Sequence, residues 1–305
     1  MADLSVAVCT WNRADLLAQT LDHLLGVRVP AGLRWELVVV DNNSSDHTPR
    51  VLADAAAAGR LPVRAVHEAR QGHTHARNRA LLEARGAWVL WTDDDVRPDP
   101  GWLDGFVAAA ARHPDAAALG GPVRPWFPHP PDPDLAAVFP PLAGGFCGVD
   151  HGPVERQLQA GEYVFGANMA YRSAATAGLK FDPRIGRRAG GQGAGDDIEF
   201  LDRVRPRGAV WWAPAMCLEH YVLPERMTLS YARRFVRDTA VGPELPADPS
   251  PRLFGAPRWL LRKAAAAWVR ATLNRRPGRR RQRLAALLEL SDAQARIAAF
   301  RRGAP

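Results

Sequence analysis

The most informative part of this chain is the stretch Trp91-Thr-Asp-Asp-Asp-Val-Arg-Pro98. It follows the apolar run Ala87–Trp91, which is typical of a buried strand, so three consecutive aspartates lie at the carboxyl end of that strand. Ligands of open α/β sheets bind outside this end. Three adjacent anions repel one another, and Mg²⁺ or Mn²⁺ on a nucleotide diphosphate would neutralise them. A solvated aspartate-rich turn is the alternative interpretation.

Short apolar runs alternate with amphipathic segments on the amino-terminal side of the aspartates. The expected strands are Ser5–Cys9, Glu36–Val40, Pro62–Val66 and Ala87–Trp91. The expected helices run through Leu25, through Ala58 and over His73–Arg85. Near-continuous apolar strands that alternate with helices predict a doubly wound α/β fold, with a mostly parallel sheet flanked by helices.

The pattern changes on the carboxyl side of the aspartates. A helix is expected over Trp102–Arg112 and a strand over Ala116–Val123. Residues 124–153 hold eight prolines, which predicts a long irregular connection of the kind that forms lids or binding loops. From Thr228 on the chain is expected to be helical.

Charge is distributed unevenly along the 305 residues, whose formal net charge is +8. Residues 252–305 hold 14 basic and 2 acidic side chains, a net charge of +12, which leaves −4 for residues 1–251. The body of the protein is therefore not expected to bind nucleic acid, whereas the tail favours an anionic partner. Only 2 of the 40 basic residues are lysines, and this chain-wide bias weakens the signal from the tail.

The composition also bears on location. The sequence has no apolar run of 18 residues, and its first residues, MADLSVAVCTWNR, have no basic segment typical of a signal peptide. Three cysteines lie far apart and in no metal-binding spacing. A cytoplasmic protein with free thiols is expected.

Six segments, read in order, resemble the motifs of family 2 glycosyltransferases, inverting enzymes of the GT-A fold. Their order over residues 4–200 is more specific than any one of them. They are Val8–Arg13, Val39–Asp46, Arg70–Asn78 (G-x-x-x-A-R-N), Asp93–Asp95 (D-x-D), Phe165–Arg172 (G-x-N-x-x-x-R) and Gly195–Phe200 (G-E-D-x-E-[FL], with Asp196 in place of the usual Glu).

The resemblance implies a GT-A-like nucleotide-diphospho-sugar transferase fold with a helical extension at its carboxyl end. Residues 1–242 are expected to form the catalytic domain, with a nucleotide-sugar half over about 1–123 and an acceptor half over about 124–242. A proline-rich hinge over 243–257 and a basic amphipathic helical tail over 258–305 would follow.

The resemblance also implies a set of residues that bind the nucleotide sugar. They are Thr10, Arg13, Asp41, Arg70, Arg77, Asn78, Asp93 and Asp94. Asp41 would accept the N3–H of uracil, although an Asx turn that opens the next loop is the alternative. For Arg77 and Asn78 the alternatives are a solvated arginine and a structural asparagine.

A divalent metal, Mn²⁺ or Mg²⁺, is the expected cofactor. In an extended chain Asp93 and Asp95 project alike and Asp94 projects oppositely. By resemblance, Asp95 would bind the metal and Asp93 the ribose or sugar, while the metal neutralises the departing diphosphate. His220 is a further candidate ligand, with an ordinary core histidine as the alternative.

Asp197 is the candidate general base, because inversion requires one group that takes the proton of the acceptor hydroxyl. The neighbouring anion Asp196 would raise its pKa. Asn168, Asp196 and Glu199 are expected on the acceptor side. The alternative is that the acids at 196 and 197 only stabilise a helix amino terminus.

The predicted function is transfer of a sugar from a UDP-sugar to a hydroxyl of a sugar, a lipid-linked glycan or a small molecule. The alternatives are a sugar-phosphate nucleotidyltransferase and a scaffold that has lost catalysis. In the tail, Leu261, Ala264, Trp268 and Ala271 share an apolar face opposite arginines. This face suggests peripheral binding to the inner, anionic face of the cell membrane.

Overall fold

The computed structural model describes residues 3–139, 144–185, 195–241, 248–276 and 278–302. The chain divides into two compact units. Unit 1 consists of Met1–Arg124 and Gly148–Tyr221, and unit 2 of Pro125–Cys147 and Val222–Pro305. Each unit is formed by segments that are distant in the sequence.

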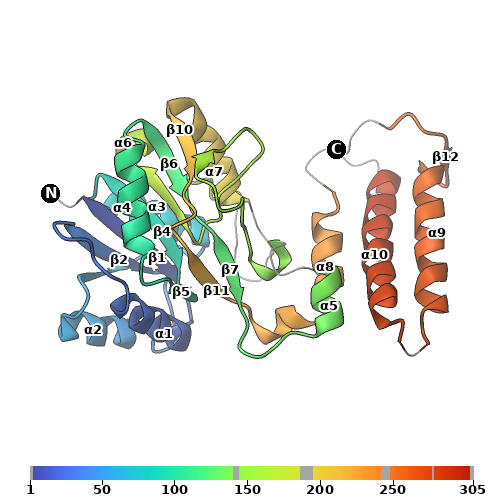
Figure 1. Cartoon of the computed structure of the whole chain (residues 1–305), viewed down its shortest axis with the longest axis horizontal. Coiled ribbons are helices and arrows are strands. Elements are labelled where there is room, and N and C mark those ends of the chain that lie inside the picture. Colours follow the sequence, from blue (N-terminus) through green and yellow to red (C-terminus); the bar gives the residue numbers. More distant parts are fainter. Residues whose placement is uncertain (1–2, 140–143, 186–194, 242–247, 277, 303–305) are drawn as a thin grey trace. The chain divides into compact units, whose positions relative to one another are not determined.

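Unit 1 is built on an eight-stranded sheet in the order β3-β2-β1-β4-β9-β6-β10-β8 (Figure 1). β8 and β9 run opposite to the other strands, so the sheet is mixed and mostly parallel. Its strands are β1 (Leu4–Thr10), β2 (Trp35–Asp41), β3 (Val63–His67), β4 (Trp88–Asp93), β6 (Ala116–Gly120), β8 (Arg156–Gln157), β9 (Met169–Arg172) and β10 (Ala209–Trp212).

Helices cover both faces of this sheet, which is why neighbouring residues of β1 are both buried: Val6 and Val8 belong to one core, and Ala7 to the other. The first core receives α1 (Ala14–Leu25), α2 (Thr48–Ala58) and α4 (Trp102–Arg112). The second receives α3 (His73–Glu83), α6 (Ser173–Thr176) and α7 (Asp196–Val204), which η2 (Arg205–Arg207) follows. The predicted α/β class with a flanked, mostly parallel sheet is confirmed.

Strand register brings the ends of three strands to one edge of the sheet. Thr10 pairs with Asp41, and Cys9 pairs with Asp93, so β1, β2 and β4 end side by side. A smaller sheet, in the order β5-β11-β7, contains β5 (Val96–Pro98), β11 (Leu218–Tyr221) and β7 (Val123–Trp126). Because His220 lies opposite Val96 in the antiparallel β5–β11 pair, it is held beside the aspartates.

Two expectations for the middle of the chain are wrong. The strand expected over Ala116–Val123 ends at Gly120, and β7 begins only at Val123, because Pro122 has no N–H to donate to a ladder. The connection over 124–153 is also less irregular than its prolines suggest. It contains α5 (Pro133–Val138), whose amino terminus is capped by the Asp132 carboxylate, and η1 (Gly144–Phe146).

Unit 2 is helical. Besides α5 and η1 it contains η3 (Pro224–Met227), α8 (Leu229–Thr239), the hairpin strands β12 (Arg252–Leu253) and β13 (Ala256–Pro257), α9 (Arg258–Leu273) and α10 (Arg280–Arg302). Leu284 and Leu288 of α10 share a core with Phe139 and Phe146. The tail is therefore integrated with segments 125–147 and 222–240. Residues 243–247 of the expected hinge lie outside the described residues.

The apolar face expected on the tail is used differently in the structure. Ala271 is buried, and Leu261 and Ala264 join the core between α9, α10 and the hairpin, because α10 packs along α9 (Figure 1). Trp268 is instead 60% exposed. No helix among the described residues is long and apolar enough to cross a membrane.

Candidate active site

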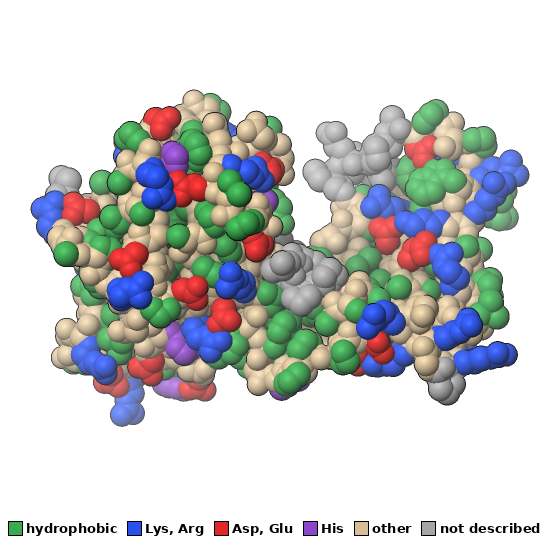
Figure 2. Space-filling model, viewed as in Figure 1, with side chains coloured by type: hydrophobic (Ala, Val, Ile, Leu, Met, Phe, Trp, Pro, Cys, Tyr) green, Lys and Arg blue, Asp and Glu red, His purple; other side chains and the backbone are tan. Residues whose placement is uncertain are grey.

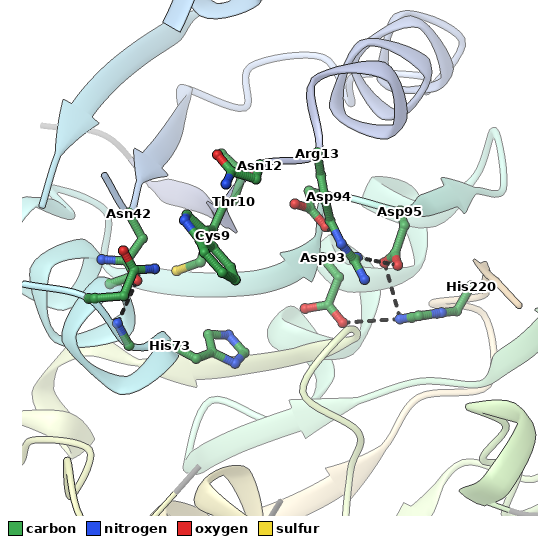
Figure 3. A pocket seen from close by; sticks show the side chains of 14 residues that line it. Cys9, Thr10, Asn12, Arg13, Asn42, His73, Asp93, Asp94, Asp95 and His220 are labelled. Carbon is green, nitrogen blue, oxygen red and sulfur yellow. Dashed lines mark hydrogen bonds and ion pairs between the residues drawn. The ribbon is translucent and has the colours of Figure 1, made fainter. Parts of the chain in front are cut away.

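A cavity of about 390 Å³ lies at the edge where β1, β2 and β4 end. It has the size of a small-ligand site. Figure 3 shows the labelled side chains that line it, and they come from strand ends, loops and a helix start that are distant in the sequence. The lining comprises Cys9, Thr10, Trp11, Asn12, Arg13, Asn42, Gln71, Gly72, His73, Ala76, Asp93, Asp94, Asp95 and His220. Four residues expected to bind the nucleotide sugar (Thr10, Arg13, Asp93 and Asp94) and both candidate metal ligands (Asp95 and His220) therefore meet in one cavity.

Asp93, Asp95 and His220 form a group that could hold a metal ion, with ligand atoms all within 4.8 Å of one another. Nε2 of His220 lies 3.2 Å from Oδ2 of Asp93 and 3.2 Å from Oδ1 of Asp95 (Figure 3). Burial tends to raise the pKa of Asp93, but the hydrogen bond and charge of His220 outweigh it and hold that pKa well below its usual range. The two carboxylates thus converge on one nitrogen.

The hydrogen bonds of His220 show that this group fits a cation. Nδ1 lies 3.0 Å from the carbonyl oxygen of Tyr221, which can only accept, so Nδ1 carries a proton. Nε2 then faces two carboxylates, and it must either carry a second proton or offer its lone pair to a cation. Two carboxylate oxygens and one imidazole suit a divalent metal ion, and a hydrogen bond that fixes the other ring nitrogen is typical of metal-binding histidines.

Arg13, which was expected to bind the nucleotide sugar, contacts two of the aspartates. Its Nη1 lies 3.0 Å from Oδ1 of Asp94 and 2.5 Å from Oδ2 of Asp95. Burial and the neighbouring Asp95 charge raise the pKa of Asp94 to about 7, although the guanidinium of Arg13 opposes the shift. Arg13 therefore supplies positive charge to two buried carboxylates.

Two asparagines that the sequence did not single out organise the loops of the cavity. Oδ1 of Asn12, a residue with φ 51°, accepts hydrogen bonds from the backbone N–H groups of Ser45 and Asp46. Asn42 accepts from Gly72 N and donates to the carbonyl of Arg70. Both asparagines follow closely after a strand, β1 or β2, and short polar side chains at such positions often form hydrogen bonds to the backbone of neighbouring loops. This position is the sequence signal that could have identified their role.

Asp41 is nearly buried and does not line the cavity. Its Oδ1 accepts a hydrogen bond from Ser44 N, which is the turn considered as the alternative role. Arg70 also lies outside the cavity lining, and it forms a bidentate pair with Glu68. Recognition of the base by Asp41 stays a prediction.

Arg77 and Asp196 form a buried ion pair beneath the cavity. Nη1 of Arg77 lies 2.8 Å from Oδ2 of Asp196, and the two side chains are 4% and 8% exposed. The guanidinium also lies over the rings of Trp91 and Phe181. Burial alone would lower the pKa of Arg77, but the charges of Asp196, Asp197 and Asp93 raise it. Arg77 therefore interacts electrostatically with Asp93 as well as with Asp196 and Asp197, although it does not line the cavity.

Three expected site residues have structural roles instead. The Asn78 amide exchanges two hydrogen bonds with the backbone of Phe181. Asn168 is fully buried, accepts from Trp102 Nε1 and donates to two carbonyl oxygens, so its side chain does not face an acceptor. Glu199 pairs with Arg203 one turn along α7. The polar atoms of Asn78 and Asn168 are engaged by the protein itself, and neither residue lines the cavity, so their contact with a ligand stays a prediction.

Asp197 lies in the first turn of α7, and its Oδ2 accepts a hydrogen bond from Gly166 N at 3.0 Å. Burial raises the pKa of its carboxyl; the charge of Asp196 adds to the shift and that of Arg77 opposes it. A half-buried carboxylate with a raised pKa has the properties of a general base.

Gly166 provides the space that this arrangement needs. A Cβ there would lie 2.3 Å from Nη2 of Arg77 and 3.1 Å from Oδ2 of Asp197. Gly166→Ala is therefore expected to displace both side chains and lower kcat about 100-fold, the usual cost of a catalytic group misplaced by about 1 Å. Initial-rate measurements test this, with Gly101→Ala as control, since a Cβ there meets only the flexible end of Arg28. Equal kcat values for the two variants would contradict the role of Gly166.

Comparison with known proteins connects this site to a family. Residues 5–125, which hold most of the cavity lining, match the family model described as glycosyl transferase family 2. A succinoglycan biosynthesis protein, ExoM, of Rhizobium meliloti is 25% identical over 240 residues, which are 76% of this chain and 72% of that protein.

Two further proteins are similar. A glucosyl-dolichyl phosphate glucuronosyltransferase of Haloferax volcanii is 25% identical over 172 residues, 55% of this chain and about half (52%) of that protein. The solved mannosyltransferase PcManGT of Pyrobaculum calidifontis, in complex with GDP-Man and Mn²⁺, has a TM-score of 0.61 at 21% identity. That match covers 96% of this chain and 86% of the mannosyltransferase, and it shows the fold. Residues 5–125 thus form a glycosyl transferase family 2 domain, and the relatives and the fold of the chain are those of GT-A glycosyltransferases.

Proposed function

We propose that this chain transfers a sugar from a nucleotide-diphosphate sugar to an acceptor hydroxyl with inversion, assisted by Mn²⁺ or Mg²⁺. The observation that carries the proposal is the convergence of Asp93, Asp95 and His220 in a cavity inside the family 2 region. The mannosyltransferase of similar fold binds GDP-Man and Mn²⁺, which supports a donor of this class.

The donor half of the reaction requires neutralisation of a diphosphate. Asp93, Asp95 and His220 would hold a divalent cation, which supplies positive charge to the departing diphosphate. The carboxyl groups of Asp94 and Asp95 contact Arg13, a residue that is expected from the sequence to bind the nucleotide. A bound cation would neutralise Asp95 in place of Arg13, and the guanidinium of Arg13 could then contact a phosphate oxygen.

The acceptor half requires one base. Asp197 takes the proton of the acceptor hydroxyl while the acceptor oxygen forms a bond to the anomeric carbon and the bond to the diphosphate breaks. An α-linked donor then gives a β-linked product, a nucleoside diphosphate and a protonated Asp197. The hydrogen bond from Gly166 N holds the carboxylate, and the Arg77–Asp196 pair braces the segment that carries it.

Calorimetric titration with UDP, GDP and dTDP, each with Mn²⁺ or with EDTA, tests the donor half. UDP is expected to bind with Mn²⁺, and EDTA or Asp95→Asn should abolish that binding, because each removes the charge that holds the diphosphate. Metal-dependent binding of GDP instead of UDP would overturn the uracil assignment of Asp41. If none of the three binds to the folded protein, the nucleotide-sugar proposal fails.

Family membership bears on the two alternative functions. A sugar-phosphate nucleotidyltransferase would carry a glycine-rich G-x-G-x-R-x-x-P loop after β1, and Thr10-Trp-Asn-Arg13 stands there instead. Release of pyrophosphate from a sugar phosphate and a nucleoside triphosphate would support that enzyme. A scaffold without catalysis would have no need to keep Asp93, Asp95 and Asp197.

We also propose that unit 2 contacts an anionic membrane surface, on the inner face of the cell membrane. Phe254 at the β12–β13 hairpin is 77% exposed, and Trp259, Trp268 and Leu273 of α9 are exposed as well. Arg258 and Arg262 lie exposed on the same helix. Exposed aromatic side chains together with arginines are typical of helices that lie in a membrane interface.

The double variant Phe254→Asn/Trp268→Ser tests the membrane contact. Asparagine tolerates the positive φ of residue 254, which is 50°, so the hairpin should persist. Loss of two exposed aromatic groups that would insert into the membrane is expected to weaken partitioning about tenfold or more. Co-sedimentation with vesicles of phosphatidylcholine and phosphatidylglycerol measures the effect, with Leu82→Asn, at a 78% exposed position of unit 1, as control. Partitioning equal to the control would show that Phe254 and Trp268 do not contact the membrane.

A further inference from the structure

A second cavity, of about 600 Å³, lies within unit 2, where α8 and the start of α5 face the connection between α9 and α10. Its lining combines one apolar group of side chains with one cationic group. The described lining is Asp132, Leu135, Met227, Thr228, Leu229, Asn274, Arg275, Arg276, Gly278, Arg280, Arg283, Leu284 and Leu287. Neither the reaction nor the fold of unit 1 uses these residues.

The apolar side of the cavity is part of the unit 2 core. Leu135, Met227 and Leu284 are buried, and Leu229 packs against them. Aliphatic side chains supply this surface, and no aromatic ring lines the cavity among the residues that the structure describes. The surface therefore suits an alkyl chain better than a nucleobase, which would stack on aromatic rings.

The cationic side holds four arginines against one carboxylate. Arg280 is bidentate to Asp132 and lies 3.5 Å from Asp134. Within the described part of the chain, Arg275, Arg276 and Arg283 form no ion pair. Three like charges around one cavity repel one another, and a bound anion would relieve that repulsion.

The start of α10 adds to this positive potential. Its first turn contains Arg280, Arg281 and Arg283, and it contains no acidic residue. The amino end of a helix is the positive end of its dipole, where cations are unfavourable and anions are stabilised. Figure 2 shows Lys and Arg side chains gathered over the lower ends of α9 and α10, where Figure 1 places their connection.

We propose that this cavity binds the phosphate headgroup of an anionic lipid. Arg275, Arg276 and Arg283 would contact the phosphate oxygens, and an acyl chain would lie on Leu229, Leu284 and Leu287. The inference rests on the proposed membrane contact of unit 2 and adds to it a specific phosphate site. The exposed face of α9 would contact the bilayer non-specifically, whereas the cavity would hold one lipid.

Short-chain lipids below their micelle concentration test the site without a membrane. Dihexanoyl phosphatidylglycerol is expected to bind to the full chain in calorimetric titration, and dihexanoyl phosphatidylcholine and glycerol 3-phosphate are expected to bind at least tenfold more weakly. The second compound lacks net charge and the third lacks a chain. Equal affinity for glycerol 3-phosphate would identify a free-phosphate site and overturn the lipid assignment. Absence of binding by all three would overturn the site altogether.

The variant Arg275→Gln/Arg283→Gln tests which arginines are responsible. Each basic residue near an anionic surface contributes about 1 kcal/mol, or about fivefold in affinity, so the pair should weaken binding about 25-fold. Arg258→Gln/Arg262→Gln removes the same charge from the exposed face of α9 and is expected to change short-chain lipid binding less than twofold. Arg280 is left intact because it holds the Asp132 cap of α5.

These outcomes separate the inference from the proposal on which it rests. If the α9 control pair weakens short-chain lipid binding as much as the cavity pair, the attraction is diffuse and the site is overturned. If the wild type partitions to vesicles but binds no short-chain lipid, the membrane contact stands and the cavity assignment fails. If the Phe254→Asn/Trp268→Ser variant partitions normally while the cavity variant does not, the cavity alone accounts for membrane binding.

Discussion

Asp197→Asn is expected to lower kcat by about 10²–10⁴-fold, the range that general base catalysis contributes. The amide has nearly the same shape and can keep its contact with the backbone near Gly166, but it cannot take a proton. Affinity for UDP with Mn²⁺ should stay within twofold, because Asp197 lies outside the donor cavity. Initial rates of transfer from a UDP-sugar and calorimetric binding of UDP measure the two quantities separately.

Glu199→Gln provides the matched control on the same helix. Glu199 pairs with Arg203 at the surface of α7, so its loss removes an exposed ion pair and should change kcat less than threefold. Near-normal transfer by a folded Asp197→Asn protein would show that another group is the base. A loss of UDP binding would show instead that Asp197 supports the donor site.

The pH dependence of the reaction follows from the same carboxyl. Burial and the charge of Asp196 raise the pKa of Asp197, and a base acts only in its ionised form. Activity is therefore present above the raised pKa and is lost as pH falls through it, so the acid limb of kcat/KM lies at higher pH than for an ordinary aspartate. The acid limb of the wild-type pH profile should be absent from the pH profile of the residual activity of Asp197→Asn.

Arg77→Met is expected to destabilise unit 1 by about 3–5 kcal/mol, because removal of one partner leaves a buried charge unpaired. Asp196 is nearly buried, and methionine keeps the aliphatic volume of Arg77 but not its charge. Amide hydrogen exchange in β1 and β4 measures the free energy of opening of this unit directly. The measurement does not require both units to unfold in one transition.

The double variant Arg77→Met/Asp196→Leu separates the ion pair from simple packing. Because the second change removes the unpaired carboxylate, it should recover most of the stability lost in the single variant. A single-variant loss below about 1 kcal/mol would show that water reaches Asp196. A double variant as unstable as the single one would assign the loss to the contacts of Arg77 with Trp91 and Phe181.

The sequence predicted the strands and the place of the aspartates because both depend on local pattern. Continuous apolar runs mark strands buried on both faces, and polar residues at their ends mark the edge where β1, β2 and β4 meet. The alternation of side chains along an extended chain likewise placed Asp93 and Asp95 together. Motif order over residues 4–200 was enough to identify the family.

Only the tertiary structure decided how identical side-chain types are used. Asn42 organises the cavity. Asn78 instead bonds to backbone 103 residues away, and Asn168 bonds to backbone carbonyls 46 and 48 residues away. Asp196 and Asp197 are neighbours in one helix turn, but Arg77 from α3 pairs with Asp196, whereas Asp197 accepts a hydrogen bond from Gly166 N. A side chain's partner comes from its spatial neighbours, and no local pattern contains them.

In the tail, too, local sequence could not predict which partner a surface would contact. Its sequence predicted an amphipathic basic segment, and periodicity alone could not say whether the apolar stripe would meet lipid or protein. In the structure α10 covers that stripe, and Trp268 and the arginines remain exposed. The sequence determines which faces of a helix are apolar and which are charged. Only the folded chain brings the neighbouring helix close, and burial of apolar area against it determines which face remains exposed for a partner.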